Sequence, residues 1–137
     1  SMPLQVELVS PEAIVYTGEA TMVVARTPDG DIAFQPGHIP FIGTLAGRGP
    51  VKIFLAEGGV KHVAVHSGFV QVANDLVSIL SDVAELPEAI DVDRATTARD
   101  RAKAVLAGDP GNAEARAALD RAELRLSVAA STSGARH

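Results

Sequence analysis

Hydrophobic and polar residues alternate in short runs along the first 86 residues of the chain. The pattern is clearest at 22–25, 51–55 and 76–80. Glycine, proline, asparagine and aspartate separate these runs at short intervals, as in Pro-Asp-Gly at 28–30. Many short alternating runs between turn signals favour an antiparallel β-sandwich or a flattened barrel. Because a sandwich of about 85 residues can bury its own core, we expect residues 1–87 to fold as one β domain.

The period of the pattern changes after Pro87. Small and apolar residues then recur every three to four positions, which predicts helices. Gly-Asp-Pro-Gly-Asn at 108–112 carries helix-stop and helix-start signals, and Asp91 is placed to cap the first helix. The sequence therefore predicts an antiparallel hairpin of two helices over 88–130. The small polar residues at 131–137 predict a disordered tail.

The facing sides of the two predicted helices consist mostly of alanine. Ala95, Ala98, Ala102 and Ala122 all belong to this apolar stripe. Alanine favours the helix but buries little apolar area, at about 25 cal/mol per Å². We therefore expect the hairpin to dock on the sandwich by only a few kcal/mol, so that a ligand or partner could shift it. A static hairpin that covers one face of the sandwich is the simpler alternative.

Composition and charge narrow the classes of function. The chain has no cysteine, which excludes a disulfide framework, thiolate zinc and cysteine catalysis. Residues 1–86 carry four Lys/Arg and nine Asp/Glu, so the whole net charge of −5 lies in this part. An acidic domain repels a phosphate backbone, so we expect no nucleic-acid partner. No apolar run reaches the roughly 18 residues that span a bilayer, and no signal peptide opens the chain, so we expect membrane association only through a partner.

The remaining polar residues give little sign of an enzyme or a metal site. No serine–histidine–acid order and no carboxylate pair in a cleft-like motif occurs. His62 and His66 are four residues apart, which suits one ion on a helix. Their segment alternates as a strand, however, where four residues span about 13 Å. We expect no catalytic residue and no metal ligand.

Four arginines of the predicted hairpin suggest an anion. Folding the hairpin brings Arg121 and Arg125 of the second helix toward Arg94 and Arg101 of the first. Guanidinium groups that converge without matching acids are typical of phosphate sites. A plainer interpretation is that Asp91 caps a helix and the arginines form a solvated face. There is no glycine-rich phosphate loop, so a bound nucleotide would be sensed without hydrolysis.

Several longer segments carry more specific motifs in a fixed order. They are Val-Glu-Leu-Val-Ser-Pro at 6–11, Tyr-Thr-Gly at 16–18, Gly-Asp-Ile-Ala-Phe-Gln-Pro-Gly-His-Ile-Pro at 30–40, Ser-Gly-Phe-Val-Gln-Val at 67–72, Leu-Ser-Asp-Val-Ala-Glu at 80–85, Ile-Asp-Val-Asp-Arg-Ala at 90–95 and Arg-x-x-x-Arg-Leu-Ser-Val at 121–128. Each motif alone is weak. The ordered set, over about residues 4–127, resembles the epsilon subunit family of bacterial F-type ATP synthases.

This resemblance implies a fold and a function. The fold would be mainly β plus α: an antiparallel β-sandwich of about ten strands, followed by the two-helix hairpin. The function would be that of a non-catalytic rotor subunit in the central stalk of a proton-translocating complex. The sandwich would join the gamma subunit to the c-ring at the cytoplasmic face of the cell membrane. The hairpin would fold onto the sandwich or extend along gamma toward the alpha and beta subunits, where it would block ATP hydrolysis.

The resemblance also assigns residues. In the family, the acid that matches Asp31 faces the c subunits, although an ordinary solvated turn is the plainer interpretation. Residues matching His38, Ile39, Pro40 and Phe41 lie at or near the gamma contact. In members that bind ATP as a regulatory ligand, the matching nucleotide-binding positions are Glu85, Ile90, Asp91, Arg94, Ala95, Arg101, Arg121 and Arg125. No cofactor is required.

A second hypothesis does not depend on a complex. The chain could be a stand-alone sandwich that binds a small molecule, such as a nucleotide, under its arginine-bearing arm. Such a protein would show no affinity for a gamma subunit, so a pull-down experiment separates the two.

Overall fold

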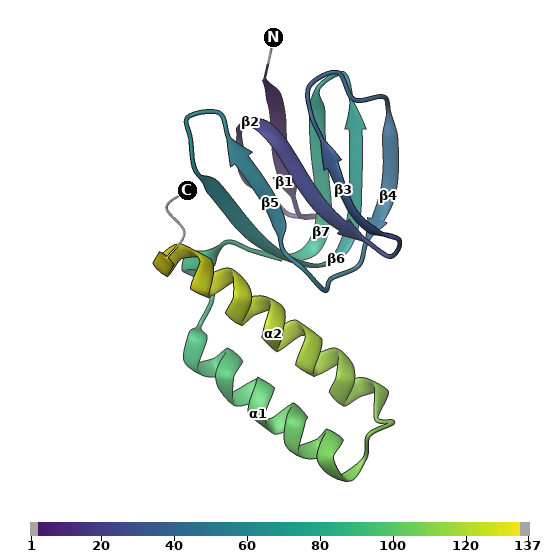
Figure 1. Ribbon diagram of the computed structural model, residues 1–137, viewed down its shortest axis with the longest axis vertical. Coiled ribbons are helices and arrows are strands. Elements are labelled where there is room, and N and C mark those ends of the chain that lie inside the picture. Colours follow the sequence, from purple (N-terminus) through teal and green to yellow (C-terminus); the bar gives the residue numbers. More distant parts are fainter. Residues whose placement is uncertain (1–2, 135–137) are drawn as a thin grey trace.

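The computed structural model describes residues 3–134 as a β-sandwich with a helical hairpin beneath it (Figure 1). In chain order the elements are β1 (Leu4–Val9), β2 (Ile14–Thr27), β3 (Gly30–Phe34), β4 (Phe41–Leu45), β5 (Val51–Leu55), β6 (Val60–Ala73), β7 (Leu76–Glu85), the 3-10 helix η1 (Pro87–Ala89), α1 (Val92–Gly108) and α2 (Ala113–Gly134). The predicted fold class, a β-sandwich followed by two antiparallel helices, is confirmed.

Five of the strands close into a ring. The hydrogen-bonded order is β1-β7-β6-β5-β2, and β2 pairs again with β1, while β3 joins β2 and β4 joins β6. Every pair is antiparallel except β1 with β7, which is parallel. A closed ring with an odd number of strands cannot alternate in direction throughout, so one parallel pair is required. The sandwich is therefore antiparallel in all but this one pair.

The described residues form seven strands where the resemblance implied about ten. The difference comes from β2 and β6, which have 14 residues each and change partners along their length. The first half of β2 pairs with β1 and the second half with β5 and β3. In the same way β6 pairs first with β5 and then with β4 and β7. Each long strand thus serves both layers of the sandwich.

The core lies between the two layers of strands. It contains apolar residues from all seven strands, with Phe34, Leu4, Leu8, Ile53 and Ile79 as its largest fully buried side chains. None of the buried residues in this core cluster belongs to a helix. Within residues 3–134, the sandwich therefore buries its own core without the hairpin. The predicted boundary at residue 87 stays a prediction.

The hairpin begins and turns as the sequence predicts. The Asp91 carboxylate accepts a hydrogen bond of 3.1 Å from the Arg94 backbone N–H and caps α1. The Asn112 side-chain oxygen accepts one of 2.9 Å from the Ala115 N–H at the start of α2. Ala95 and Ala102 of α1 are buried against the second helix, as the alanine stripe implied.

The predicted disordered tail is wrong for residues 131–134, because α2 runs through Gly134. The Ser131 hydroxyl donates a 2.5 Å hydrogen bond to the Val128 carbonyl oxygen, so this small polar residue stays within the helix. Extending an existing helix needs no new nucleus. Residues 135–137 of the predicted tail lie outside the described residues.

Only a small surface joins the hairpin to the sandwich. The second helix packs on β6 and η1, and α1 lies on the far side of α2 (Figure 1). The buried contact consists of Ala64 from β6, Ile90, and Leu124 and Val128 from α2, and we call these four residues the docking cluster. Arg48, between β4 and β5, reaches Asp120 of α2 at 3.9 Å.

We expect Gly68→Ala to destabilise the sandwich more than Gly58→Ala. A Cβ at position 68 would lie 2.1 Å from the Leu80 carbonyl oxygen, whereas one at position 58 would meet nothing within 4 Å. Both glycines have positive φ, 150° and 110°, so the pair separates steric contact from backbone strain. Overpacking of this kind costs about 1–3 kcal/mol. Thermal unfolding measures it, and equal melting temperatures would contradict the argument.

Candidate anion-binding pocket at the hairpin junction

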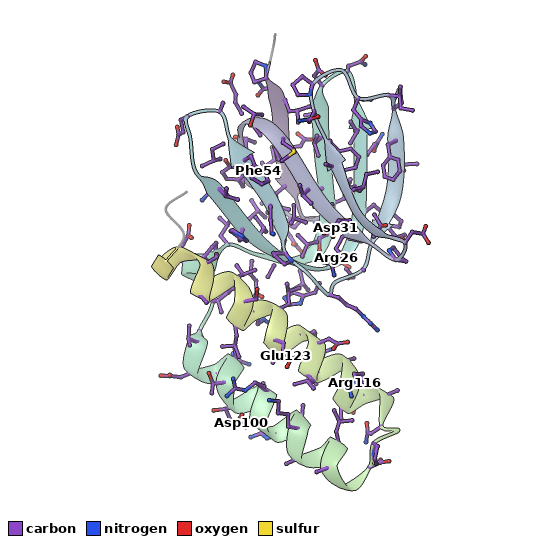
Figure 2. The ribbon with its side chains drawn as sticks, in the orientation of Figure 1. Arg26, Asp31, Phe54, Asp100, Arg116 and Glu123 are labelled. Carbon is purple, nitrogen blue, oxygen red and sulfur yellow. The ribbon has the colours of Figure 1, made fainter. Side chains whose placement is uncertain are left out.

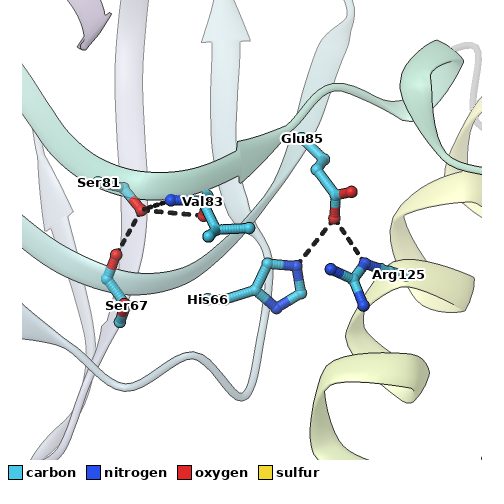
Figure 3. Close-up of polar contacts among 6 residues, drawn as sticks. All are labelled: His66, Ser67, Ser81, Val83, Glu85 and Arg125. Atoms are coloured by element: carbon cyan, nitrogen blue, oxygen red, sulfur yellow. Dashed lines mark hydrogen bonds and ion pairs between the residues drawn. The ribbon is translucent and has the colours of Figure 1, made fainter. Parts of the chain in front are cut away.

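One carboxylate joins three elements where the sandwich meets the hairpin. Glu85 ends β7, and its Oε1 lies 2.9 Å from His66 Nε2 of β6 and 2.7 Å from Arg125 Nε of α2 (Figure 3). Burial alone would raise the pKa of Glu85, but the hydrogen bonds from His66 and Arg125 outweigh it and lower the pKa. The carboxylate is therefore held in its charged form and ties the helix to the sheet.

An open pocket of about 840 Å³ lies beside this carboxylate, between the start of α1 and α2. It is lined by Glu85, Ala89, Asp91, Asp93, Arg94, Ala95, Thr97, Ala98, Arg101 and Arg125. The pocket therefore brings together six of the eight residues that the resemblance assigned to a nucleotide. Their role in binding stays a prediction.

Two of the eight residues are placed elsewhere. Ile90 is 9% exposed, belongs to the docking cluster and does not line the pocket. Arg121 is exposed and does not line the pocket. Its charge acts instead on His66, whose pKa it helps to lower. Ile90 can support the pocket only by packing.

The sequence had suggested that the arginines converge without matching acids, but the pocket contains both. Three carboxylates line the pocket beside its three arginines, and Glu85 pairs with Arg125. Within residues 3–134, however, the guanidinium groups of Arg94 and Arg101 have no hydrogen-bond or ion-pair partner. These two exposed cations are the groups that remain available to an anion.

Sequence reasoning missed His66 as a member of this site. The structure confirms the prediction that His62 and His66 lie on a strand, which is β6. The alternation along β6 could have placed His66. Because Val63 and Val65 point into the core, the residue after Val65 must face the opposite side of the sheet. The 19-residue separation of His66 and Glu85 along the chain hid their contact.

A second set of predicted residues lies on the sandwich itself. Asp31 forms an ion pair with Arg26 across the β2–β3 hairpin, which lowers the pKa of Asp31 (Figure 2). Both residues line an open pocket of about 900 Å³ together with Arg48. Asp31 therefore shares a pocket with a residue that reaches α2.

The segment from His38 to Phe41 presents apolar surface. The His38 ring packs edge-on against Phe34, with 5.0 Å between ring centroids. Ile39 is 74% exposed, and Pro40 and Phe41 are exposed and half-buried. Sequence reasoning missed further exposed apolar residues on the outer face of β4, β6 and β7, namely Ile42, Phe69 and Leu80. An exposed apolar face of this kind is typical of a protein–protein contact.

No helix among the described residues is long and apolar enough to cross a bilayer. The sandwich belongs to a known class of domain: residues 3–87 match the family model for the β-sandwich domain of the ATP synthase delta/epsilon chain. The ATP synthase epsilon chain of Streptomyces griseus is 47% identical over 127 residues, covering 93% of this chain and 95% of that one. That of Shouchella clausii is 44% identical over 127 residues, covering 92% and 94%. The chain belongs to the ATP synthase epsilon chain family, a non-catalytic subunit of the enzyme complex.

Solved structures agree on the fold. A chain in the cryo-EM structure of the Euglena gracilis mitochondrial ATP synthase, OSCP/F1/c-ring, superposes with a TM-score of 0.74 at 22% identity, over 90% of this chain and 81% of that one. A chain of the Tetrahymena thermophila mitochondrial ATP synthase central stalk/c-ring gives 0.55 at 14% identity, over 96% and 97%. Both likenesses include the hairpin as well as the sandwich, since nearly the whole chain is covered.

We expect Glu85→Ala to loosen α2 from the sandwich. The change leaves His66 and Arg125 without their acceptor, and lost hydrogen bonds to charged groups cost about 1.5–3 kcal/mol. Amide hydrogen exchange along α2 measures the effect, with exposed Glu88→Ala as control. Because the hydrogen bonds from His66 and Arg125 lower the pKa of Glu85, this contribution is present above its ordinary pKa of 4.5 and is lost as pH falls through the lowered value. Equal exchange in both variants would contradict the role of Glu85.

Proposed function

We propose that this chain is a rotor subunit in the central stalk of an F-type ATP synthase, and that its hairpin is a movable arm that restrains ATP hydrolysis. The observation that carries the proposal is the separation of the two hydrophobic clusters. The core cluster holds the sandwich together, and the much smaller docking cluster attaches the arm. Central-stalk and c-ring assemblies among the structural neighbours support the same assignment.

The size of the docking cluster sets the energy scale of the movement. Leu124 and Val128 are its larger buried side chains on α2, and Ala64 adds little area. Burying a Leu or Val side chain contributes about 1.5–3 kcal/mol, before side-chain ordering is subtracted. A net docking energy of a few kcal/mol lies within the range that one ligand or partner can reverse.

The sandwich would couple the gamma subunit to the c-ring. The apolar segment 38–41 and the adjoining outer face of β4, β6 and β7 would dock on gamma, because such a face gains most from being covered. Asp31 would face the polar loops of the c subunits, where rim charges set register more than affinity. Released from the sandwich, the hairpin would extend along gamma toward the alpha and beta subunits. The subunit would then lie peripherally at the cytoplasmic face of the membrane.

The pocket at the hairpin junction would take ATP as a regulatory ligand. Arg94 and Arg101 would hold phosphate oxygens, while Glu85 keeps Arg125 in place and Asp91 caps α1. Ala95 lines the same wall and leaves room beside the arginines. The carboxylates of the pocket would repel a polyanion, so binding would depend on Arg94 and Arg101, whose guanidinium groups have no partner within residues 3–134.

ATP bound at this place would favour the docked arm. A ligand that binds only the docked state stabilises it by RT ln(1 + [L]/Kd), about 2.7 kcal/mol at a hundredfold excess over Kd. This amount is comparable with the docking energy. When ATP is scarce, the arm would be released and would restrain ATP hydrolysis. This is the direction of response that a sensor of ATP supply requires. Membership in the epsilon chain family leaves the stand-alone binding protein as the weaker hypothesis.

Calorimetry with the isolated chain tests the ligand. We expect heat of binding with millimolar ATP, and at least a tenfold loss of affinity in Arg94→Ala, because one charge-assisted contact is worth about 1.5–3 kcal/mol. Arg116→Ala is the matched control, since Arg116 is an exposed arginine of α2 outside the pocket. The absence of heat with the unmodified chain would end the ATP proposal.

Truncation tests whether the sandwich is sufficient for assembly and whether the hairpin restrains ATP hydrolysis. We expect a chain that ends before Ile90 to assemble with gamma and the c-ring and to raise ATP hydrolysis by the complex several-fold. The reason is that the core cluster contains no helical residue. Copurification and ATPase assays measure the two outcomes. A truncated subunit that no longer assembles, or that leaves hydrolysis unchanged, would contradict the proposal.

A further inference from the structure

Two histidines of β6 lie on the face of the sheet that the hairpin covers. Ala64 belongs to the docking cluster, and His62 and His66 flank it at the alternate positions of the same strand. The Nδ1 atom of each ring is buried and has no hydrogen-bond partner among the described residues. Neither histidine belongs to the core cluster or lines the candidate pocket.

The surroundings of His66 favour its neutral form. Its side chain is 5% exposed. Nε2 faces Glu85 of β7, and the charges of Arg121 and Arg125 of α2 also act on the ring. A neutral ring can donate its Nε2–H to Glu85 and leave Nδ1 without a proton. A second proton on Nδ1 would have no acceptor and would lie near two guanidinium groups.

We propose that His66 is a proton-sensitive switch that releases the hairpin from the sandwich at mildly acidic pH. The proposal rests on the movable arm of the proposed function. Moving α2 away exposes the ring to water and removes Arg121 and Arg125, so the released state accepts the proton that the docked state resists. His62, beside Lys52 of the neighbouring strand β5, adds a second and weaker contribution.

The direction of the effect follows from the docked-state pKa values. Burial, opposed by the Glu85 hydrogen bond and reinforced by Arg125 and Arg121, lowers the pKa of His66 below its ordinary 6.5. Burial and Lys52 likewise lower the pKa of His62. The docked state therefore binds fewer protons, and docking weakens as pH falls below about 6.5. Glu85 acts in the same direction but only below its ordinary pKa of 4.5, in a separate pH window.

A distance measurement in the isolated chain tests the switch. The chain has no cysteine, so Glu12→Cys on the sandwich and Lys103→Cys on α1, both exposed, give a unique pair for donor and acceptor dyes. We expect the ratio of released to docked arms to rise several-fold between about pH 7.5 and 5.5. One histidine can contribute at most about tenfold over that range.

Substitution by glutamine separates titration from packing. His66→Gln keeps a donor for Glu85 and cannot titrate, so we expect it to lose most of the pH response. His62→Gln should lose a smaller part, and the double variant should be flat. His38→Gln is the matched control, because His38 packs on Phe34 between β3 and β4 and should leave the response unchanged.

Leu124→Asp shows whether the arm can leave at all, because it places a charge in the docking cluster. If this variant releases the arm while the unmodified chain ignores acid, the His66 proposal is overturned and the movable arm stands. An unchanged acid response in the double glutamine variant would also overturn it. If neither acid nor Leu124→Asp moves the arm, both proposals fail.

Discussion

The contact between α2 and β6 is the constraint on which the rest of this structure depends. Among the described residues, the ring of strands closes on itself and buries a core cluster to which no helix contributes. The hairpin therefore adds no residue to the core cluster of the sandwich and is held by the docking cluster and a few polar contacts. An arm attached in this way can leave without unfolding the body, because the cost of leaving is local.

The polar contacts beside the docking cluster give that attachment its sensitivity. A purely apolar contact responds weakly to ligands and protons, since its free energy depends mainly on the apolar area that it buries. Here one carboxylate, Glu85, satisfies both a histidine and an arginine from different elements. At this partly buried site each of these polar groups depends on the others, so the loss of one weakens the contacts that remain. Under the proposed mechanism, small changes in charge would be converted into changes in docking.

Local patterns predicted most of the fold, and long-range pairing accounts for what they missed. Alternation placed the strands, and the cap at Asp91 placed α1, because both signals lie within a few residues. The parallel β1–β7 pair follows from ring closure, which no local pattern encodes. The same holds for the site. Spacing along helices brought Arg94 and Arg101 to one pocket, but the partners of Glu85 lie 19 and 40 residues away and could not be read from spacing.

The proposed nucleotide pocket and the proposed histidine switch share two residues, which would couple them. Glu85 and Arg125 line the pocket and also face His66. An anion that bound the docked arm would raise the cost of releasing it, and a proton on His66 would lower that cost. By linkage the two effects are reciprocal: the anion must weaken proton uptake by as much as the proton weakens anion binding. A rise in ATP concentration and a fall in pH would then act on one equilibrium with opposite signs, through Glu85 and Arg125.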